Sequence, residues 1–244
     1  MRYAIYFAAP ANDPLMELGS LWLGRDPFTG LPVIQPHVPG VSAQRLAELT
    51  ADPRRYGFHG TLKAPFSLKQ GVLEDDLLAE CARFGSHVAP FGIPGLEVTR
   101  LGRFLALTPS EEAPELPALA ALCVKTFEPF RAPLPESDLA RRRAAGLTRV
   151  QDNNLVHWGY PYVFGDFRFH MTLTNKLVDD NEALYLERAA QSHFQEMTGR
   201  PITCTAFGLY VEPERGAPFE VHSMFDLTGE TRPSEAAARL KEVQ

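Results

Sequence analysis

One short motif occurs twice in the sequence, and its residue types suit acid–base chemistry. Phe-His-x-Thr-Leu stands at residues 58–62 and again at residues 169–173. Imidazole accepts or donates a proton near neutral pH, so two histidines can act as a general base and a general acid. A threonine two residues later offers a hydroxyl donor to an oxyanion, and together these groups suit cleavage of a phosphate ester without a metal. The candidate catalytic residues are therefore His59, Thr61, His170 and Thr172.

Each copy of the motif alternates apolar and polar residues, which is typical of a β-strand. The alternation places the histidine, the threonine and one cation of each copy on a single face. The cation is Lys63 in the first copy and Arg168 in the second. We expect both to bind substrate, because a cation offsets the charge of a phosphate. The alternatives are an exposed lysine at a strand end and an arginine paired with Asp166.

An aromatic segment precedes the second motif. Trp158, Tyr160 and Tyr162 are interleaved with glycine and proline, a composition typical of a loop. Such a loop can form a lid whose rings stack on a sugar or a base, so Tyr160 and Tyr162 are candidate substrate-binding residues. Packing of these rings between two lobes is the alternative.

The charge of the 244-residue chain favours a small ligand over a long one. The net charge is −6, whereas binding of long nucleic acid needs clustered lysines and arginines. The only basic cluster is Arg141–Arg143, in a helix-like stretch at residues 136–149 that also holds acidic residues, which predicts a solvated helix face. We expect a small phosphorylated substrate and no long nucleic acid. The sequence does not indicate an oligomeric state.

The cysteines and the opening segment indicate in which cellular compartment the protein works. The three cysteines have no Cys-x-x-Cys spacing, which favours a reducing cytoplasm over a disulfide framework or a zinc ribbon. Residues 1–10 are too short and too interrupted by tyrosines for a signal peptide, so we interpret them as the first strand. No apolar run approaches the roughly 18–20 residues of a membrane helix, and we expect no membrane partner.

The periodicity of the chain predicts the same order of elements twice, because each motif strand is followed by an amphipathic helix and then by a β-hairpin. The helices are predicted at residues 74–88 and 182–198, and the hairpins at residues 96–108 and 202–227. Two more helices are predicted at residues 42–50, with Ser42 as N-cap, and at residues 115–130.

This repetition predicts a pseudo-two-fold, bilobal α+β fold, in which two antiparallel sheets face each other across a cleft with helices on the outside. We expect one compact domain in four parts. They are a first lobe at residues 1–113, bridging helices and a loop at 114–167, a second lobe at 168–230 and a tail at 231–244 that is either a weak helix or mobile.

The two His-x-Thr motifs resemble those of the two-histidine phosphoesterases, which include cyclic phosphodiesterases and RNA 2′,5′-ligase-like enzymes. Longer segments resemble a bacterial branch of that superfamily linked to phosphonate metabolism. These segments are residues 3–7, 22–26, 56–66 and 158–163. The resemblance implies that both motifs line one groove, and that the protein opens a cyclic phosphodiester of a small phosphorylated ribose or nucleotide without a metal or other cofactor. It leaves open which histidine is the base.

Three alternatives remain beside this hypothesis. A zinc hydrolase would need ligand spacings such as His-Glu-x-x-His or His-x-His, and the sequence has neither. An enzyme acting on RNA ends with a 2′,3′-cyclic phosphate differs only in substrate. A non-catalytic nucleotide-binding module would not need a duplicated acid–base pair. The sequence also lacks the Gly-x-Ser-x-Gly motif of α/β-hydrolases and the Gly-x-x-x-x-Gly-Lys-Ser/Thr motif of P-loop enzymes.

Overall fold

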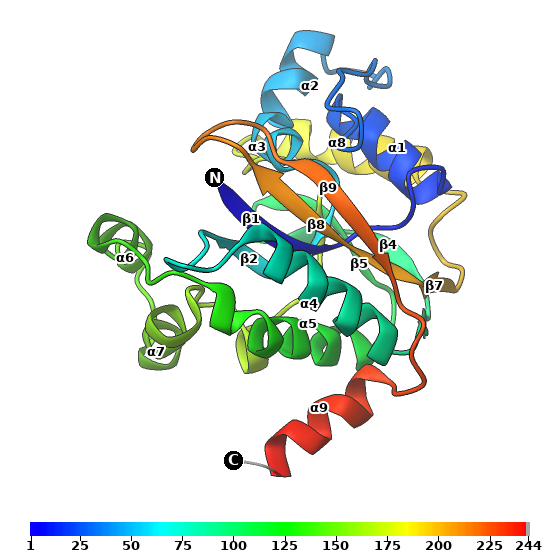
Figure 1. Ribbon diagram of the computed structural model, residues 1–244. Helices are drawn as coiled ribbons and strands as arrows, with labels where there is room; N and C mark the ends of the chain where they lie inside the picture. Colours follow the sequence, from blue (N-terminus) through cyan, green and yellow to red (C-terminus); the bar gives the residue numbers. More distant parts are fainter. Residues whose placement is uncertain (243–244) are drawn as a thin grey trace.

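The computed structural model describes residues 1–242 and the side chains of residues 1–239. Helices surround two antiparallel sheets (Figure 1). The strands are β1 (Arg2–Phe7), β2 (Gly60–Phe66), β3 (Phe91–Ile93), β4 (Leu96–Leu101), β5 (Phe104–Pro109), β6 (Met171–Thr172), β7 (Ile202–Cys204), β8 (Ala206–Glu212) and β9 (Glu220–Asp226). One sheet has the order β4-β5-β6-β2-β1-β8-β9, and the other is the pair β3-β7. The predicted α+β class with two antiparallel sheets is confirmed.

The helices predicted at residues 42–50, 74–88, 115–130 and 182–198 are present with shifted ends, and helices also occur at residues 51–56 and 149–158, where none was predicted. The helices are α1 (Pro14–Leu23), α2 (Ala43–Leu49), α3 (Ala51–Tyr56), α4 (Glu74–His87), α5 (Glu115–Thr126), α6 (Glu136–Arg143), α7 (Arg149–Trp158), α8 (Asp180–His193) and α9 (Pro233–Glu242), with 3₁₀ turns at Glu128–Phe130 and Phe164–Asp166. Ser42 caps α2 by accepting a hydrogen bond from the Arg45 amide (3.1 Å). The α9 helix falls in the expected tail, whose last two residues lie outside the described residues.

The α7 helix was not predicted. The stretch expected to be one helix to residue 149 stops at Arg143, and a second helix begins after Thr148. The Thr148 side chain accepts from the Gln151 amide, while the Gln151 side chain accepts from the Thr148 amide, which is a capping box. This threonine-x-x-glutamine spacing was the signal available in the sequence.

The two motif strands lie side by side in the larger sheet. Four strands, β9-β8-β1-β2, join three strands, β6-β5-β4, through a single aligned pair, Gly60 and Met171. The β4–β5 hairpin pairs with β6 of the second motif, and the β8–β9 hairpin pairs with β1. Strands from residues 1–113 and from residues 168–230 therefore interleave in one sheet and are not grouped by segment. Each hairpin instead covers the open backbone edge of a strand from the other segment, which leaves fewer unpaired amides and carbonyls.

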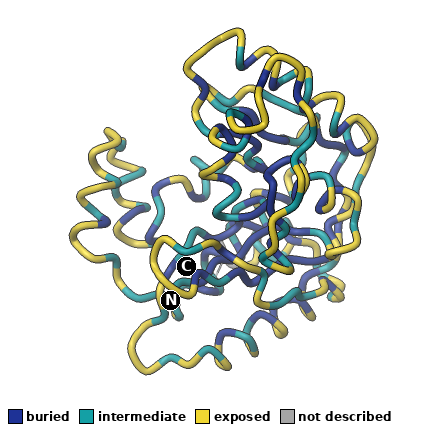
Figure 2. Tube along the Cα trace, turned by 90° about the horizontal axis from the view of Figure 1, so that it is seen from above, coloured by how far each residue is buried: buried dark blue, intermediate teal, exposed yellow. Residues whose placement is uncertain are grey.

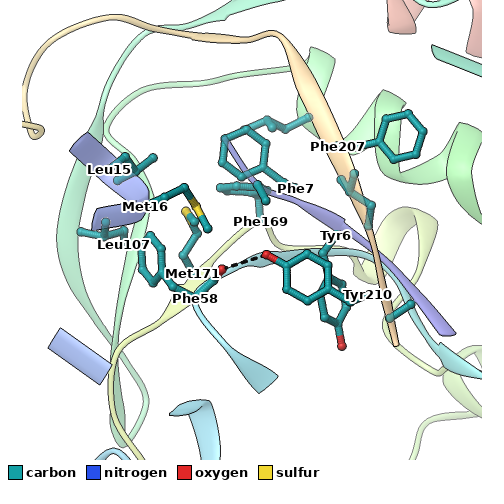
Figure 3. Close-up of a cluster of buried hydrophobic side chains, with 14 of the residues drawn as sticks. Tyr6, Phe7, Leu15, Met16, Phe58, Leu107, Phe169, Met171, Phe207 and Tyr210 are labelled. Carbon is teal, nitrogen blue, oxygen red and sulfur yellow. Dashed lines mark hydrogen bonds between the residues drawn. The ribbon is translucent and has the colours of Figure 1, made fainter. Parts of the chain in front are cut away.

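The core lies against the face of the motif strands opposite the histidines. Phe58, Phe169 and Met171 are buried there, and Figure 3 shows them packed among side chains from β1, α1 and β5. A Cβ at Gly60 would lie 2.6 Å from the Phe169 ring, so this position requires glycine. Because alternate residues of a strand point to opposite faces, burying these side chains directs His59, Thr61, His170 and Thr172 to the other side.

Burial is greatest in the central strands and least at the rim, where the α6–α7 hairpin projects from the body at the left of the view (Figure 2). All three cysteines are buried and unpaired. None of the helices in the described part of the chain combines the length and the apolar character needed to cross a membrane.

Candidate active site

The antiparallel pairing of the two motifs brings their polar residues together. With Gly60 aligned to Met171, each histidine lies opposite the threonine of the other motif, His59 by Thr172 and His170 by Thr61. All four line one cavity of about 500 Å³. Among the side chains that the structure describes, no three His, Cys, Asp or Glu residues lie together as metal ligands would.

The two imidazoles are oriented by the same local hydrogen bond. His59 Nδ1 donates to the carbonyl of Gly57, two residues earlier, and His170 Nδ1 donates to the carbonyl of Arg168, also two residues earlier, each at 2.8 Å. A carbonyl only accepts, so Nδ1 carries the hydrogen in both rings. Nε2 of each ring is thereby left for proton transfer, and His59 Nε2 lies 3.2 Å from the Thr61 hydroxyl.

Aromatic rings enclose His59. Its imidazole stacks on the Tyr6 ring, with 3.8 Å between the ring centres, and the ring centres of Tyr56 and Tyr210 lie within 6.2 Å. Burial, together with the nearby His170, lowers the pKa of His59 to about 4, in spite of the stabilising hydrogen bond to Gly57. At pH 7 the His59 imidazole is therefore neutral and can accept a proton.

The cavity is strongly cationic, since five arginines line it and no aspartate or glutamate is among its described lining residues. The arginines are Arg2, Arg55, Arg141, Arg142 and Arg215. They come from β1, α3, α6 and the turn between β8 and β9. A cavity of this composition favours an anionic ligand.

Two carboxylates behind the cavity wall hold four of these arginines in place. Glu212, which is fully buried, accepts from Arg2 (2.5 Å) and Arg55 (2.9 Å). Burial by itself would raise the pKa of Glu212, but the hydrogen bond from Arg2 and the charges of both arginines hold that pKa below its usual range. Guanidiniums anchored in this way are positioned before a ligand arrives.

Asp138 on α6 holds two further arginines of the cavity lining, as Glu212 holds Arg2 and Arg55. It pairs with Arg215 (2.5 Å) and Arg141 (2.9 Å), and the first of these pairs ties α6 to the β8–β9 turn. The expectation that Arg141–Arg143 forms only a solvated helix face is therefore wrong for Arg141 and Arg142. Arg143 pairs instead with Asp152 on α7 (2.6 Å).

Lys63 does not reach the cavity, so its expected role in substrate binding is wrong. The residue is 2% exposed, and Nζ donates to the Val124 carbonyl (3.0 Å) and to Glu128 (2.9 Å). The β1–β2 pairing carries an extra β2 residue between Thr61 and Lys63, and such a bulge reverses the faces that follow it. Ala64 lines the cavity in place of the lysine.

Arg168 and Tyr162 lie at a neighbouring cavity of about 360 Å³ that also includes His170. The exposed Arg168 guanidinium donates to the Phe167 carbonyl (3.1 Å), and Asp166 accepts from Gln151 rather than from Arg168. Tyr160 lines both cavities. The structure thus groups Tyr160 with the two histidines and places Arg168 and Tyr162 to one side of His170.

A known protein family covers the chain from Thr61 of the first motif through the whole of the second motif. A family model described as "Protein of unknown function (DUF1045)" matches residues 61–220, more than half of the chain. The chain belongs to the DUF1045 family. In its two His-x-Thr motifs it also resembles the two-histidine phosphoesterases.

This DUF1045 chain is similar to two curated relatives, each named "Ribose 1,5-bisphosphate phosphokinase PhnN". It is 40% identical to the protein of Janthinobacterium sp. (strain Marseille), over 94% of this chain and 51% of the relative. It is 38% identical to that of Laribacter hongkongensis (strain HLHK9), over 91% of this chain and 50% of the relative. The chain spans about half the length of the curated relatives it matches.

Two solved structures were also found to be similar. The crystal structure of TT0787 of Thermus thermophilus matches 95% of this DUF1045 chain and 100% of its own, with 17% identity and a TM-score of 0.46. The structure of E. coli LigT complexed with 3′-AMP matches 93% of this chain and 98% of its own, with 14% identity and a TM-score of 0.42.

Sequence reasoning missed most of the residues around the two motifs. The cavity of this DUF1045 protein takes residues from segments far apart in the chain, beginning at Arg2 and ending at Gly216. Nothing in the local pattern distinguishes Arg2, Arg55 or Arg215 from ordinary surface arginines. Tyr6 shares a strand face with Arg2 by the two-residue alternation of β1, which was the only signal that could have linked them.

Proposed function

We propose that this DUF1045 protein is a phosphoesterase that opens a cyclic phosphodiester of a small phosphorylated ribose or nucleotide. The observation that carries the proposal is the pair of imidazoles at one arginine-lined cavity, each with its Nε2 left for proton transfer. Hydrolysis of a phosphodiester requires two such groups, because the attacking water loses a proton and the leaving oxygen gains one. The resemblance of the motifs to those of two-histidine phosphoesterases supports the same reaction.

In the proposed reaction His59 is the general base. Its lowered pKa keeps the ring neutral, so Nε2 takes a proton from water as the water oxygen attacks phosphorus. Protonated His170 donates from Nε2 to the sugar oxygen as the bond from that oxygen to phosphorus breaks. The product is a phosphomonoester with a free sugar hydroxyl, and exchange with solvent returns both histidines to their starting states.

The threonines and arginines stabilise the charge that develops on phosphorus. Thr61 and Thr172 stand opposite the histidines of the other motif, where their hydroxyls donate to the non-bridging oxygens. Since the arginines are already held by Glu212 and Asp138, they need little reorganisation when the substrate binds.

The names of the relatives support a phosphorylated ribose as substrate. Both name a ribose bisphosphate, although the chain covers only about half of each relative. The kinase activity in those names does not transfer to this chain, whose sequence has no Gly-x-x-x-x-Gly-Lys-Ser/Thr phosphate-binding loop. We therefore propose hydrolysis for this chain and take only the sugar phosphate from the names.

A panel of cyclic phosphates assayed with EDTA present tests the proposal. The panel contains ribose 1,2-cyclic phosphate with and without a 5-phosphate, nucleoside 2′,3′-cyclic phosphates and RNA ending in a 2′,3′-cyclic phosphate, with products identified by phosphorus NMR. We expect turnover of a small cyclic phosphate that is lost in the His59→Ala/His170→Ala double variant. Activity confined to RNA ends would favour the RNA-processing alternative, and binding without turnover of any compound would favour the nucleotide-binding module.

A further inference from the structure

The charge of the cavity exceeds what a single cyclic phosphate can balance. Five guanidiniums line it, and the two carboxylates bonded to them are Glu212 and Asp138. Three positive charges are left over even when both histidines are neutral. A cyclic phosphodiester carries one negative charge, whereas a phosphomonoester carries nearly two at pH 7. A substrate with one group of each kind would match the excess.

Arg142 is where the unbalanced charge is concentrated. Of the five arginines it alone makes no ion pair or hydrogen bond within the side chains described, and its Nε is buried without an acceptor. Buried polar groups are nearly always hydrogen-bonded, and a guanidinium at a cavity wall without a protein partner is suited to a bound anion. Burial lowers the pKa of Arg142, which is the direction expected for a guanidinium without a counter-ion.

The orientation of Arg142 is fixed although it has no anionic partner. Its guanidinium stands 5.0 Å from the centre of the Tyr160 ring, a cation–π contact that leaves the terminal N–H groups without a protein acceptor. Its helix is anchored by the Asp138–Arg215 ion pair. The planar guanidinium matches a phosphate with two parallel hydrogen bonds, so the arginine is held ready for an oxyanion.

The size and lining of the cavity leave room for a second phosphate. Its volume of about 500 Å³ lies in the range that accommodates whole small-molecule ligands rather than a single phosphoryl group. Arg142 comes from α6, whereas the His-x-Thr motifs flank the Gly60–Met171 pair of the sheet. A ligand that fills the cavity therefore meets the histidines from the sheet and Arg142 from the helical hairpin.

We propose that Arg142 anchors a second anion subsite, which binds a phosphomonoester group carried by the sugar of the cyclic phosphodiester. This inference rests on the proposed function and defines its substrate class further, as a sugar cyclic phosphate that bears an additional phosphomonoester. Tyr160 is the positioning residue of the subsite, and Arg142 determines the specificity for the second phosphate.

Two substrates and a matched pair of variants test this subsite. The substrates are ribose 1,2-cyclic phosphate with and without a 5-phosphate, and the variants are Arg142→Gln and Arg143→Gln. Arg143 adjoins Arg142 in sequence but pairs with Asp152 outside the cavity lining, so it controls for the loss of one charge from α6. Removing Arg142 should lower kcat/KM on the phosphorylated substrate by about tenfold to a hundredfold more than on the other, the weight of a charge-assisted phosphate contact.

A binding measurement separates this inference from the proposed reaction. Ribose 5-phosphate should bind the wild type in calorimetry at concentrations where ribose gives no signal, and it should bind Arg142→Gln at least about tenfold more weakly. Arg143→Gln should bind it like the wild type. If no cyclic phosphate is hydrolysed, the proposed function fails and this comparison still tests the subsite.

Three results would contradict the proposal that Arg142 anchors a second anion subsite. They are equal loss on both substrates in Arg142→Gln, unchanged binding of ribose 5-phosphate in that variant, and a wild type that binds ribose and ribose 5-phosphate equally. The last comparison needs no variant, so it can overturn the subsite even if Arg142→Gln does not fold.

Discussion

The two His-x-Thr motifs have the same sequence pattern but different surroundings. The first belongs to β2, a seven-residue strand between β1 and β6, and its His59 stacks on Tyr6 among further tyrosines. The second belongs to β6, a two-residue strand, and its His170 lies where two cavities meet, 5.7 Å from the Phe104 ring. The local hydrogen bond of each imidazole is nevertheless the same.

This difference shows how a duplicated motif can provide two unlike proton-transfer groups. The hydrogen bond to the carbonyl two residues earlier comes with the motif, because it involves only residues of one segment. The desolvation that lowers the pKa of His59 comes from rings on β1, α3 and β8. The motif therefore fixes the tautomer, and the tertiary packing lowers the pKa of His59.

The largest effect should follow removal of either imidazole. His59→Ala and His170→Ala should each lower kcat on the best cyclic phosphate by about 10²- to 10⁴-fold, the usual contribution of one acid–base group. Steady-state kinetics of the two variants beside the wild type measures this. Near-normal turnover in one variant would mean that the motifs are not an acid–base pair.

The pH dependence of stability should report the burial of His59 in the first motif. The folded-state pKa of His59 is about 4, against an ordinary value of 6.5. The unfolded chain therefore takes up this proton first as the pH falls, and the stability present above pH 6.5 is lost between pH 6.5 and 4. The loss amounts to as much as about 3 kcal/mol.

Urea unfolding of the wild type and His59→Gln at pH 7.5 and at pH 4.5 measures this contribution. The wild type should lose more of its unfolding free energy between the two pH values than the variant does. Equal losses would show that the His59 ring is not desolvated.

The middle residues of the two motifs should differ in how well they tolerate substitution. Gly60→Ala places a methyl group against the Phe169 ring and should destabilise the protein by about 1–3 kcal/mol through overpacking. Met171→Leu, at the aligned position, keeps the volume and should cost less than about 1.5 kcal/mol. Thermal unfolding of both variants measures the difference, and a harmless Gly60→Ala would contradict the packing described for this pair.

The smallest effect on activity is expected at Lys63. Because its ammonium is bound to Val124 and Glu128 away from the cavity, Lys63→Met should leave kcat/KM within about twofold of the wild type, since it touches no reacting group. Its unfolding free energy should fall by about 1–3 kcal/mol, because the Val124 carbonyl loses its donor. A large loss of activity with unchanged stability would mean that Lys63 does take part in substrate binding.

Predictions from the sequence succeeded where one segment carries the whole signal. The cap at Ser42, the hairpin at residues 96–108 and a hairpin within residues 202–227 are local patterns, and the structure has them. The α7 helix was missed although its capping box was visible. Lys63 was misplaced because a bulge depends on how β1 pairs with β2, which the alternation of β2 alone does not reveal.

The sequence by itself determined the two motifs, their strand-like alternation and the carbonyl that fixes each imidazole, since these depend on residues adjacent in the chain. Only the tertiary structure decided that Gly60 aligns with Met171, that aromatic rings enclose His59 alone, and that arginines from separate elements converge on one cavity. Strand register and ring burial arise from contacts between distant segments, which compete across the whole fold and leave no local pattern.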